Sequence, residues 1–203
     1  IAERTVGDLK ITDIRVQTEE AGAKIGKPVG RYLTIELKSG SPSADELLEQ
    51  SQTISECLSS MLPKDGDIMV VGLGNRDITP DALGPRAAEK VIATRHLPPD
   101  IPGIGKTRGV TAVIPGVLGT TGIESADFIK ALHRETYPAA VLVIDALASR
   151  RLSRLASTIQ IADCGINPGS GVGNHRMEIS QKTLGVPVIA LGIPMVVDGT
   201  TLA

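Results

Sequence analysis

Apolar and polar residues alternate in two segments near the start of the chain, residues 9–18 and 31–38. Ile11, Ile14 and Val16 carry the pattern in the first segment, and similar residues carry it in the second. A period of two is typical of strands that have one buried face. A Gly-, Lys- and Pro-rich connection separates the two segments, so the pattern predicts an N-terminal pair of strands.

Residues 43–62 follow a different period, because most of their apolar positions recur at helical spacing. Either Ser43 or Asp45 can cap the first turn, since both side chains accept hydrogen bonds from backbone N–H groups. This segment is predicted to form an amphipathic helix. The apolar positions are Leu47, Leu48, Ile54, Leu58, Met61 and Leu62.

The rest of the chain alternates between apolar runs of strand length and helical stretches. Continuous apolar strands that alternate with helices indicate a mainly parallel sheet with helices on both faces. We therefore predict a single α/β layered domain over residues 1–203. The predicted strands are 68–73, 110–114, 139–144, 158–162 and 186–193, and the predicted helices are about 85–96 and 123–137.

Composition narrows the classes of function. Hydrophobic residues make up 41% of the chain, charged residues 22%, and the formal net charge is −2. These values indicate a packed core and no extended basic surface for direct nucleic-acid binding. The longest apolar runs are far shorter than the roughly 20 residues that a membrane-spanning helix needs, so no membrane association is expected.

The cysteines and the first residue bear on location and processing. Cys57 and Cys164 lie far apart without a disulfide-like or metal-like pattern, and no basic and apolar leader opens the chain. Both observations favour a reducing, cytoplasmic compartment. The chain begins at Ile1 instead of Met, which we interpret as N-terminal processing or truncation.

Two aspartates lie just beyond predicted strands. Asp81 belongs to the loop that follows the strand 68–73, and Asp145 comes directly after the apolar run 139–144. In open α/β sheets, ligands bind in the crevice beyond the carboxyl ends of the strands. Each aspartate alone also fits a structural role as a helix cap or an acceptor for loop amides.

A pair of carboxylates in one crevice permits acid–base chemistry. Two like charges at close range cannot both ionise cheaply, so one carboxyl keeps its proton. The ionised member can take a proton from a water that attacks a peptide carbonyl, and the protonated member can hydrogen-bond the developing oxyanion. Spacing in the sequence does not establish that Asp81 and Asp145 are such a pair.

Other motifs fit known sites less well. Gly72-Leu73-Gly74 follows a strand as a dinucleotide fingerprint does, but Asp77 stands where the third glycine is required. The glycine-rich residues 169–173 match neither a P-loop nor a nucleophile elbow, and they favour a flexible or ligand-approaching loop. The three histidines, His96, His133 and His175, form no His-Glu-x-x-His helix. We therefore expect no cofactor and no tightly bound metal.

Several collinear blocks are together more specific than any single motif above. They are Val71-Gly72-Leu73-Gly74-Asn75, Thr79-Pro80-Asp81-Ala82-Leu83-Gly84-Pro85, Thr94-Arg95-His96-Leu97, Pro115-Gly116-Val117-Leu118-Gly119, Thr121-Gly122-Ile123-Glu124, Ile144-Asp145-Ala146-Leu147-Ala148-Ser149-Arg150 and Pro168-Gly169-Ser170-Gly171-Val172-Gly173-Asn174. With the N-terminal segments 20–23 and 30–33, they cover nearly the whole chain. In this order they resemble one family, the germination proteases of bacterial spores.

The resemblance implies an endopeptidase of the spore core that degrades small acid-soluble, DNA-protecting spore proteins at germination. The family's proposed catalytic aspartates fall on Asp81 and Asp145, which implies an atypical aspartic protease. It also implies a homotetramer that is made as a zymogen, and a family C-terminal region that this chain lacks. Because the family cleaves beside an acidic residue, Arg150 is the expected substrate-binding cation, through two parallel hydrogen bonds.

Two alternatives remain open. The fold also resembles that of the hydrogenase-maturation proteases, so the first alternative is a metal-dependent processing protease in which a histidine such as His96 or His175 approaches the aspartates. The second is a non-catalytic scaffold that binds spore proteins through the glycine-rich loop. A chelator and a cleavage assay discriminate among the three hypotheses.

Overall fold

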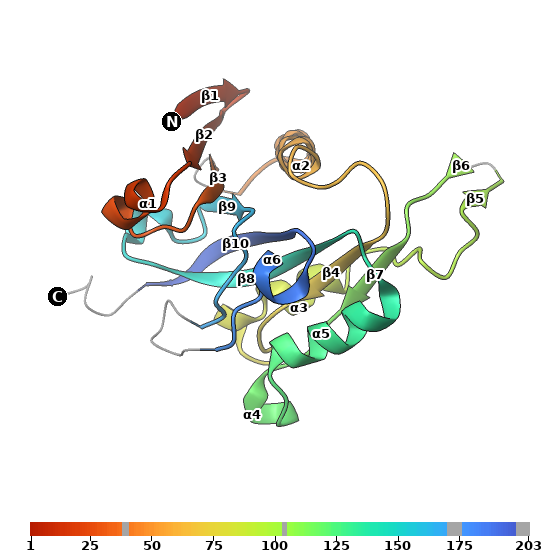
Figure 1. Ribbon diagram of the computed structural model, residues 1–203. Helices are drawn as coiled ribbons and strands as arrows, with labels where there is room; N and C mark the ends of the chain where they lie inside the picture. The colour runs from red at the N-terminus through yellow and green to blue at the C-terminus, as the bar shows by residue number, and fades with distance from the viewer. Residues whose placement is uncertain (38–40, 103–104, 170–175, 198–203) are drawn as a thin grey trace.

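A mixed sheet organises the residues that the structure describes. The computed structural model describes residues 1–37, 41–102, 105–169 and 176–197. Over these residues, one eight-stranded sheet has the order β1-β2-β3-β9-β10-β8-β4-β7 (Figure 1). Its strands are β1 (Ala2–Val6), β2 (Leu9–Val16), β3 (Gly30–Glu36), β4 (Ile68–Gly72), β7 (Val110–Val113), β8 (Ala140–Ser149), β9 (Thr158–Ala162) and β10 (Val188–Val197).

The sheet has a parallel half and an antiparallel half. Strands β10, β8, β4 and β7 run parallel to their neighbours within that group. Strands β1, β2, β3 and β9 pair antiparallel, and β9 joins the two halves through an antiparallel pairing with β10. The predicted α/β class is confirmed, and the predicted N-terminal strand pair is β2 with β3.

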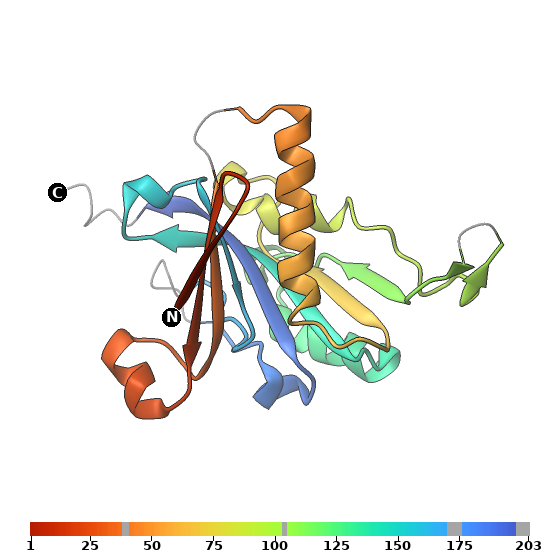
Figure 2. The ribbon, with the colours of Figure 1, turned by 90° about the horizontal axis from the view of Figure 1, so that it is seen from above.

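Helices cover both faces of the parallel half, as predicted (Figures 1 and 2). Ile68 and Val70 of β4 point into the core cluster that contains residues of α2 and α3, whereas Met69 and Val71 point into the cluster that contains residues of α5 and α6. This alternation is the two-residue period of a strand that is buried on both faces. The helices are α1 (Glu19–Ile25), α2 (Ala44–Ser59), α3 (Leu83–Ala88), α4 (Leu118–Thr121), α5 (Ser125–Thr136) and α6 (Gln181–Leu184).

Helix α2 begins where the sequence predicts a cap. Ser43 Oγ accepts the N–H of Glu46 at 3.2 Å, and the Glu46 carboxylate accepts the N–H of Ser43 at 2.7 Å. This reciprocal capping box satisfies two N–H groups that have no partner within the helix. Of the two predicted caps, Ser43 is therefore the one used.

Several boundaries differ from the sequence prediction. The helix expected over 85–96 ends at Ala88, because the N–H groups of Thr94 and Arg95 donate to the carbonyl of Val110 and tie this segment to β7 instead. Short elements with little apolar content, such as the exposed β1 and the helix α1, were not predicted. A small hairpin of β5 (Asp100–Ile101) and β6 (Gly105–Lys106) extends away from the sheet (Figure 1).

Strands β8 and β10 are longer than the apolar runs that predicted them. The run ending at Ile144 continues as strand through Ser149, so Asp145 lies within β8 and not on a loop after it. Strand β10 likewise continues to Val197, with a register shift between Pro194 and Val196. The extra length matters for the site, because the neighbouring strand β4 ends opposite Ile144.

Candidate active site

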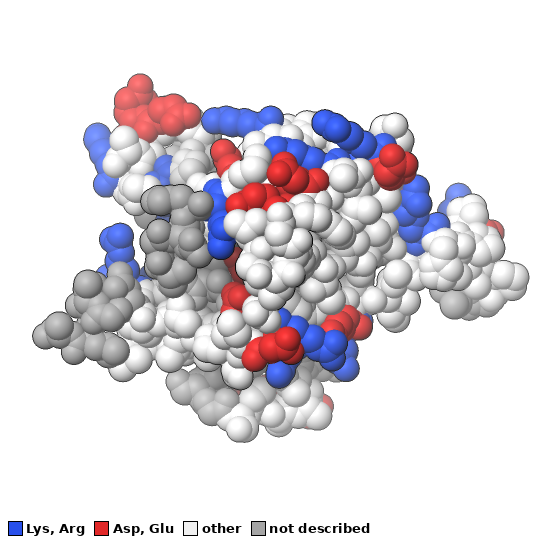
Figure 3. All heavy atoms as spheres, turned by 90° about the horizontal axis from the view of Figure 1, so that it is seen from below, with Lys and Arg blue, Asp and Glu red and all other residues white. Residues whose placement is uncertain are grey.

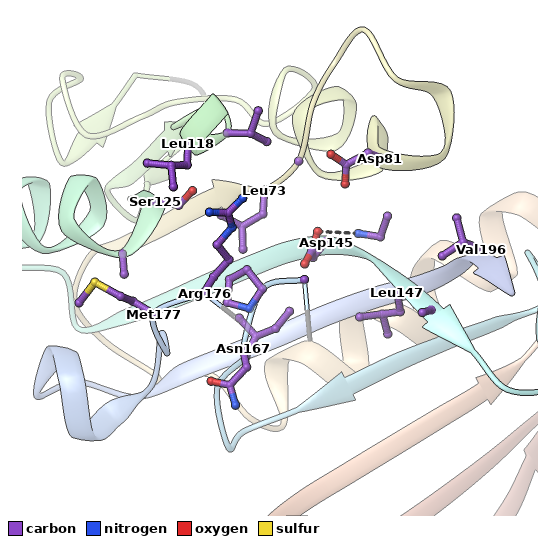
Figure 4. Close-up of a pocket in the computed structure, with 18 of the residues that line it drawn as sticks. Leu73, Asp81, Leu118, Ser125, Asp145, Leu147, Asn167, Arg176, Met177 and Val196 are labelled. Atoms are coloured by element: carbon purple, nitrogen blue, oxygen red, sulfur yellow. Dashed lines mark hydrogen bonds between the residues drawn. The ribbon is translucent and has the colours of Figure 1, made fainter. Parts of the chain in front are cut away.

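A cavity of about 640 Å³ opens beyond the end of β4, where the crevice was predicted. Segments from distant parts of the sequence meet there, including the loop after β4, the start of α5 and the last part of β8 (Figure 4). The lining residues with polar side chains are Asp81, Glu124, Ser125, Asp145, Gln160, Asn167 and Arg176.

The loop after β4 carries Asp81 into this cavity. Asp81 is the last residue of a single 3₁₀ turn, η1 (Thr79–Asp81), with Pro80 in its first positions. Its Oδ2 accepts the N–H of Asn75 at 2.7 Å. A Cβ on Gly74 would lie 2.1 Å from the Asp81 carbonyl oxygen, and Gly74 has φ +114°, so only glycine allows this approach.

Close packing of α3 fixes the other end of the same loop. A Cβ on Gly84 would lie 2.2 Å from the carbonyl oxygen of Leu73 and 2.4 Å from that of Ile144. A Cβ on Gly72 would in turn lie 2.2 Å from the carbonyl oxygen of Gly84. The two glycines therefore bring the backbone of α3 against the ends of β4 and β8, which positions the Asp81 loop over the sheet.

Asp145 is the first residue of β8 that extends past β4. Ile144 is still paired with Gly72 of β4, whereas Asp145 is paired only with Gly192 of β10 on the opposite side. The residue is buried, with 7% of its surface exposed. Its Oδ1 accepts the N–H of Ala146 at 2.9 Å, shown as the dashed line in Figure 4.

The environment of Asp145 favours its protonated form. Burial is the main cause that raises its pKa, to about 7, and the negative charge of Asp81 raises it further. The hydrogen bond from the Ala146 N–H lowers the pKa, and its influence is smaller than that of burial but larger than that of the Asp81 charge. A carboxyl group that titrates near neutral pH inside a cavity can both hold and release a proton under working conditions.

The structure thus brings the two predicted aspartates into one cavity, close enough for the charge of one to shift the pKa of the other. Asp145 projects from the sheet, and Asp81 projects from the overlying loop (Figure 4). Both side chains line the cavity, so a water or a peptide group that enters the cavity can reach them. This arrangement can supply one proton acceptor and one proton donor.

The arginine expected to bind substrate lies elsewhere. Arg150 follows the end of β8, is exposed and is not among the residues that line the cavity. Arg176 does line the cavity (Figure 4). Its Nη1 lies 3.6 Å from Oε1 of Glu124, the residue that precedes α5. The sequence reasoning missed Arg176, although its position directly after the glycine-rich block was a usable signal.

The histidines that the structure describes do not line the cavity. His96 is exposed and does not line the cavity. His175 and most of the glycine-rich block lie outside the described residues. Within residues 1–37, 41–102, 105–169 and 176–197, no three His, Cys, Asp or Glu side chains are grouped so that they could hold a metal ion.

Comparison with known proteins identifies the family. The model of the family described as germination protease matches residues 1–203. The chain belongs to the germination protease family. It is 46% identical to the germination protease of Clostridium perfringens strain ATCC 13124, over 99% of this chain and 64% of that protein. With the germination protease of Bacillus subtilis strain 168, the identity is 47% over 99% of this chain and 56% of that protein.

The chain therefore spans about three fifths of the length of these curated relatives. Among solved structures, it is similar to a NiFe hydrogenase maturation protease from Thermococcus kodakarensis, with a TM-score of 0.44 and 18% identity. That similarity covers 71% of this chain and 88% of the other.

Charged side chains of both signs are mixed on the surface. On the face shown in Figure 3, acidic and basic side chains are interspersed and form no broad field of one sign. Of the helices in the described part of the chain, none is long and apolar enough to span a membrane.

Proposed function

We propose that the protein is an endopeptidase that starts the degradation of small acid-soluble, DNA-protecting spore proteins during germination. Membership of the germination protease family supports the peptidase activity and its timing. One observation supports the catalytic assignment above all others: Asp145 is buried in a cavity with a pKa near 7 and within electrostatic reach of Asp81.

In the proposed mechanism, the two aspartates have different roles. Asp81, the more exposed of the pair, takes a proton from a water as the water oxygen bonds to the carbonyl carbon of the peptide. Asp145 starts protonated, passes its proton to the oxyanion that forms on the carbonyl oxygen, and takes the proton back when the carbonyl re-forms. The carbon–nitrogen bond then breaks, and the proton held by Asp81 passes to the departing amine.

The raised pKa of Asp145 explains why this residue holds the proton. Desolvation disfavours its ionised form, and the negative charge of Asp81 disfavours it further. Asp81 keeps its orientation through the hydrogen bond from the Asn75 N–H. The two residues therefore form an asymmetric pair, with the roles set by their surroundings and not by residue type.

The wider biological setting belongs to the same proposal. The protein acts in the spore core on small acid-soluble spore proteins, as a homotetramer that matures from a zymogen. It makes no direct contact with nucleic acid. These features rest on family membership, and oligomeric state in solution is measured by sedimentation equilibrium of the protein.

A single assay tests the activity against both alternatives. The protein is incubated with a purified small acid-soluble spore protein, with and without a strong chelator, beside its Asp145→Asn variant. Cleavage that resists the chelator and disappears in the variant supports the proposal. Chelator-sensitive cleavage that one added metal restores would favour a metal-dependent processing protease, and binding without cleavage by the unaltered protein would favour a scaffold.

A further inference from the structure

We infer that the polypeptide substrate binds as an added β-strand along the edge of β8 formed by residues 145–149, beside Asp145. This inference rests on the proposed function, because the docked segment contains the bond to be cut. Binding through an exposed sheet edge uses backbone hydrogen bonds for affinity, so it accepts many sequences in an extended conformation.

The edge exists because two neighbouring strands differ in length. Strand β8 has ten residues and β4 has five, and their pairing ends with Gly72 opposite Ile144. On its other side β8 stays paired with β10 through Ser149. In the described part of the chain, no strand pairs with the β4 side of β8 beyond Ile144, which leaves a row of backbone groups without strand partners.

The direction of each backbone group follows from the alternation along β8. The carbonyl of Ile144 points to the β4 side, where it accepts the N–H of Leu73 at 2.9 Å, while the N–H of Val141 donates to Pro187 on the β10 side. Even-numbered residues of β8 therefore present their backbone groups to the open edge. Past Ile144, these residues are Ala146 and Ala148.

The two alanines offer two acceptors and one donor to an incoming strand. The N–H of Ala146 is already used, since it donates to Asp145 Oδ1 at 2.9 Å. No described strand pairs with the carbonyls of Ala146 and Ala148 or with the N–H of Ala148, so these three groups remain for pairing. Both residues line the 640 Å³ cavity, and their methyl side chains leave room for another backbone to approach.

The catalytic groups lie beside this edge. A strand that pairs with Ala146 places a peptide group next to Asp145, the preceding residue on β8. Asp81 faces the same space from the overlying loop (Figure 4). A strand rises about 3.3 Å per residue, so a segment of about five residues occupies the edge from Asp145 to Ser149.

The first experiment measures hydrogen exchange of one backbone amide. The protein carries Asp81→Asn to prevent cleavage and is labelled with ¹⁵N-alanine, and a saturating small acid-soluble spore protein is the probe. Exchange at the Ala148 N–H is expected to slow by about tenfold or more, while Ala190 of β10, which lies between two strands, is unchanged. Unchanged exchange at Ala148 would overturn the inference.

The second experiment uses the substrate, so it does not depend on folding of a variant. Single N-methyl groups are placed in turn along a peptide that spans the cleaved bond, and kcat/KM is measured with the unaltered protein. If the substrate pairs as a strand, N-methylation should lower kcat/KM by about tenfold at every second residue of the part of the peptide that pairs with β8. The reason is that only alternate N–H groups of the peptide face the edge. A scan without a period of two would overturn the inference.

The results separate this inference from the proposed function. Slowed exchange at Ala148 without any cleavage by the unaltered protein would support the edge and refute the catalytic assignment. Cleavage by the unaltered protein with no slowing of exchange at Ala148 would refute the edge and support the catalytic assignment. Slow exchange at Ala148 before any substrate is added would show that the protein itself, or a second copy, covers the edge, and this would also overturn the inference.

Discussion

Two carboxylates in the two halves of the sheet have opposite environments. Asp13 of β2, in the antiparallel half, contacts Arg31 of β3 through two guanidinium nitrogens, with the shortest distance 2.8 Å from Nη2 to Oδ2. These hydrogen bonds are the main cause that lowers the pKa of Asp13. Asp145, in the parallel half, forms no ion pair with any described Lys or Arg, and burial raises its pKa to about 7.

The difference separates a carboxylate in a structural ion pair from the one to which the proposed function assigns proton transfer. The charge of Asp13 is compensated, and its partner Arg31 also donates to Ser60 and, through its backbone N–H, to Asp163. Such a network stabilises the sheet but is not poised to exchange protons. An uncompensated buried carboxyl costs stability when it ionises, and such groups are found preferentially where chemistry needs them.

The largest expected effect comes from removing the proton exchange of either cavity aspartate. Asp81→Asn and Asp145→Asn are each expected to lower kcat/KM on a small acid-soluble spore protein by about 100 to 10,000-fold, because an amide keeps the shape but neither takes nor gives a proton at working pH. Circular dichroism checks that the fold is intact. Asp13→Asn is the matched control, and a comparable loss in that variant would remove the contrast between the two carboxylates.

The second expected effect is on stability as a function of pH. The pKa of Asp145 is raised in the folded state, so its contribution to stability is fully present below its unfolded pKa of 3.8 and is lost as pH rises through about 7. Between pH 4 and 8, the unaltered protein should lose up to about 4 kcal/mol of unfolding free energy relative to Asp145→Asn. Urea unfolding of both proteins across this range measures the difference. Parallel curves would mean that Asp145 titrates normally.

A smaller effect of opposite sign is expected at Asp13. Its pKa is lowered in the folded state, so its contribution is present above the unfolded pKa and is lost as pH falls through the folded pKa. At pH 7, Asp13→Asn should cost about 1 to 2 kcal/mol of unfolding free energy, since the pair is partly exposed. The cost should shrink below pH 4. Urea titrations at pH 7 and pH 3 measure both values, and an equal cost at the two would argue against an ionic role.

The smallest expected effect concerns selection of an acidic residue beside the cleaved bond. Arg176 lines the cavity, whereas Arg150, the arginine expected from the sequence, is exposed outside the lining. Arg176→Gln should therefore lower kcat/KM by about three- to tenfold more for a peptide with Glu beside the bond than for its Gln analogue. Arg150→Gln is the matched variant. Selective loss in Arg150→Gln alone would support Arg150, and not Arg176, as the substrate-binding cation.

The hydrophobic pattern was sufficient for several strands of the sheet. The strands β4, β7 and β9 lie within one or two residues of their predicted bounds, because each is an apolar run of strand length between polar turns. The position of the cavity was also predicted from the pattern, since the cavity lies beyond the end of β4. Both aspartates were named from their places after apolar runs, and the family resemblance named the same two residues.

Local pattern did not predict where strands and helices would stop. The end of α3 depends on a hydrogen bond between Thr94 and Val110, which are 16 residues apart. The continuation of β8 past Ile144 depends on pairing with β10, about 45 residues later in the chain. Interactions over such separations leave no periodic signal in the sequence near either partner.

The sequence by itself determined the α/β class, the helices on both faces and the identity of the two cavity aspartates, because these depend on local periodicity and residue type. Only the tertiary structure decided that Asp145 is buried beside Asp81 and that Arg176, and not Arg150, lines the cavity. It also decided that β8 extends past the end of β4, which leaves an open sheet edge. The physical reason is that burial, charge coupling and strand pairing are set by residues distant in sequence that folding brings into contact.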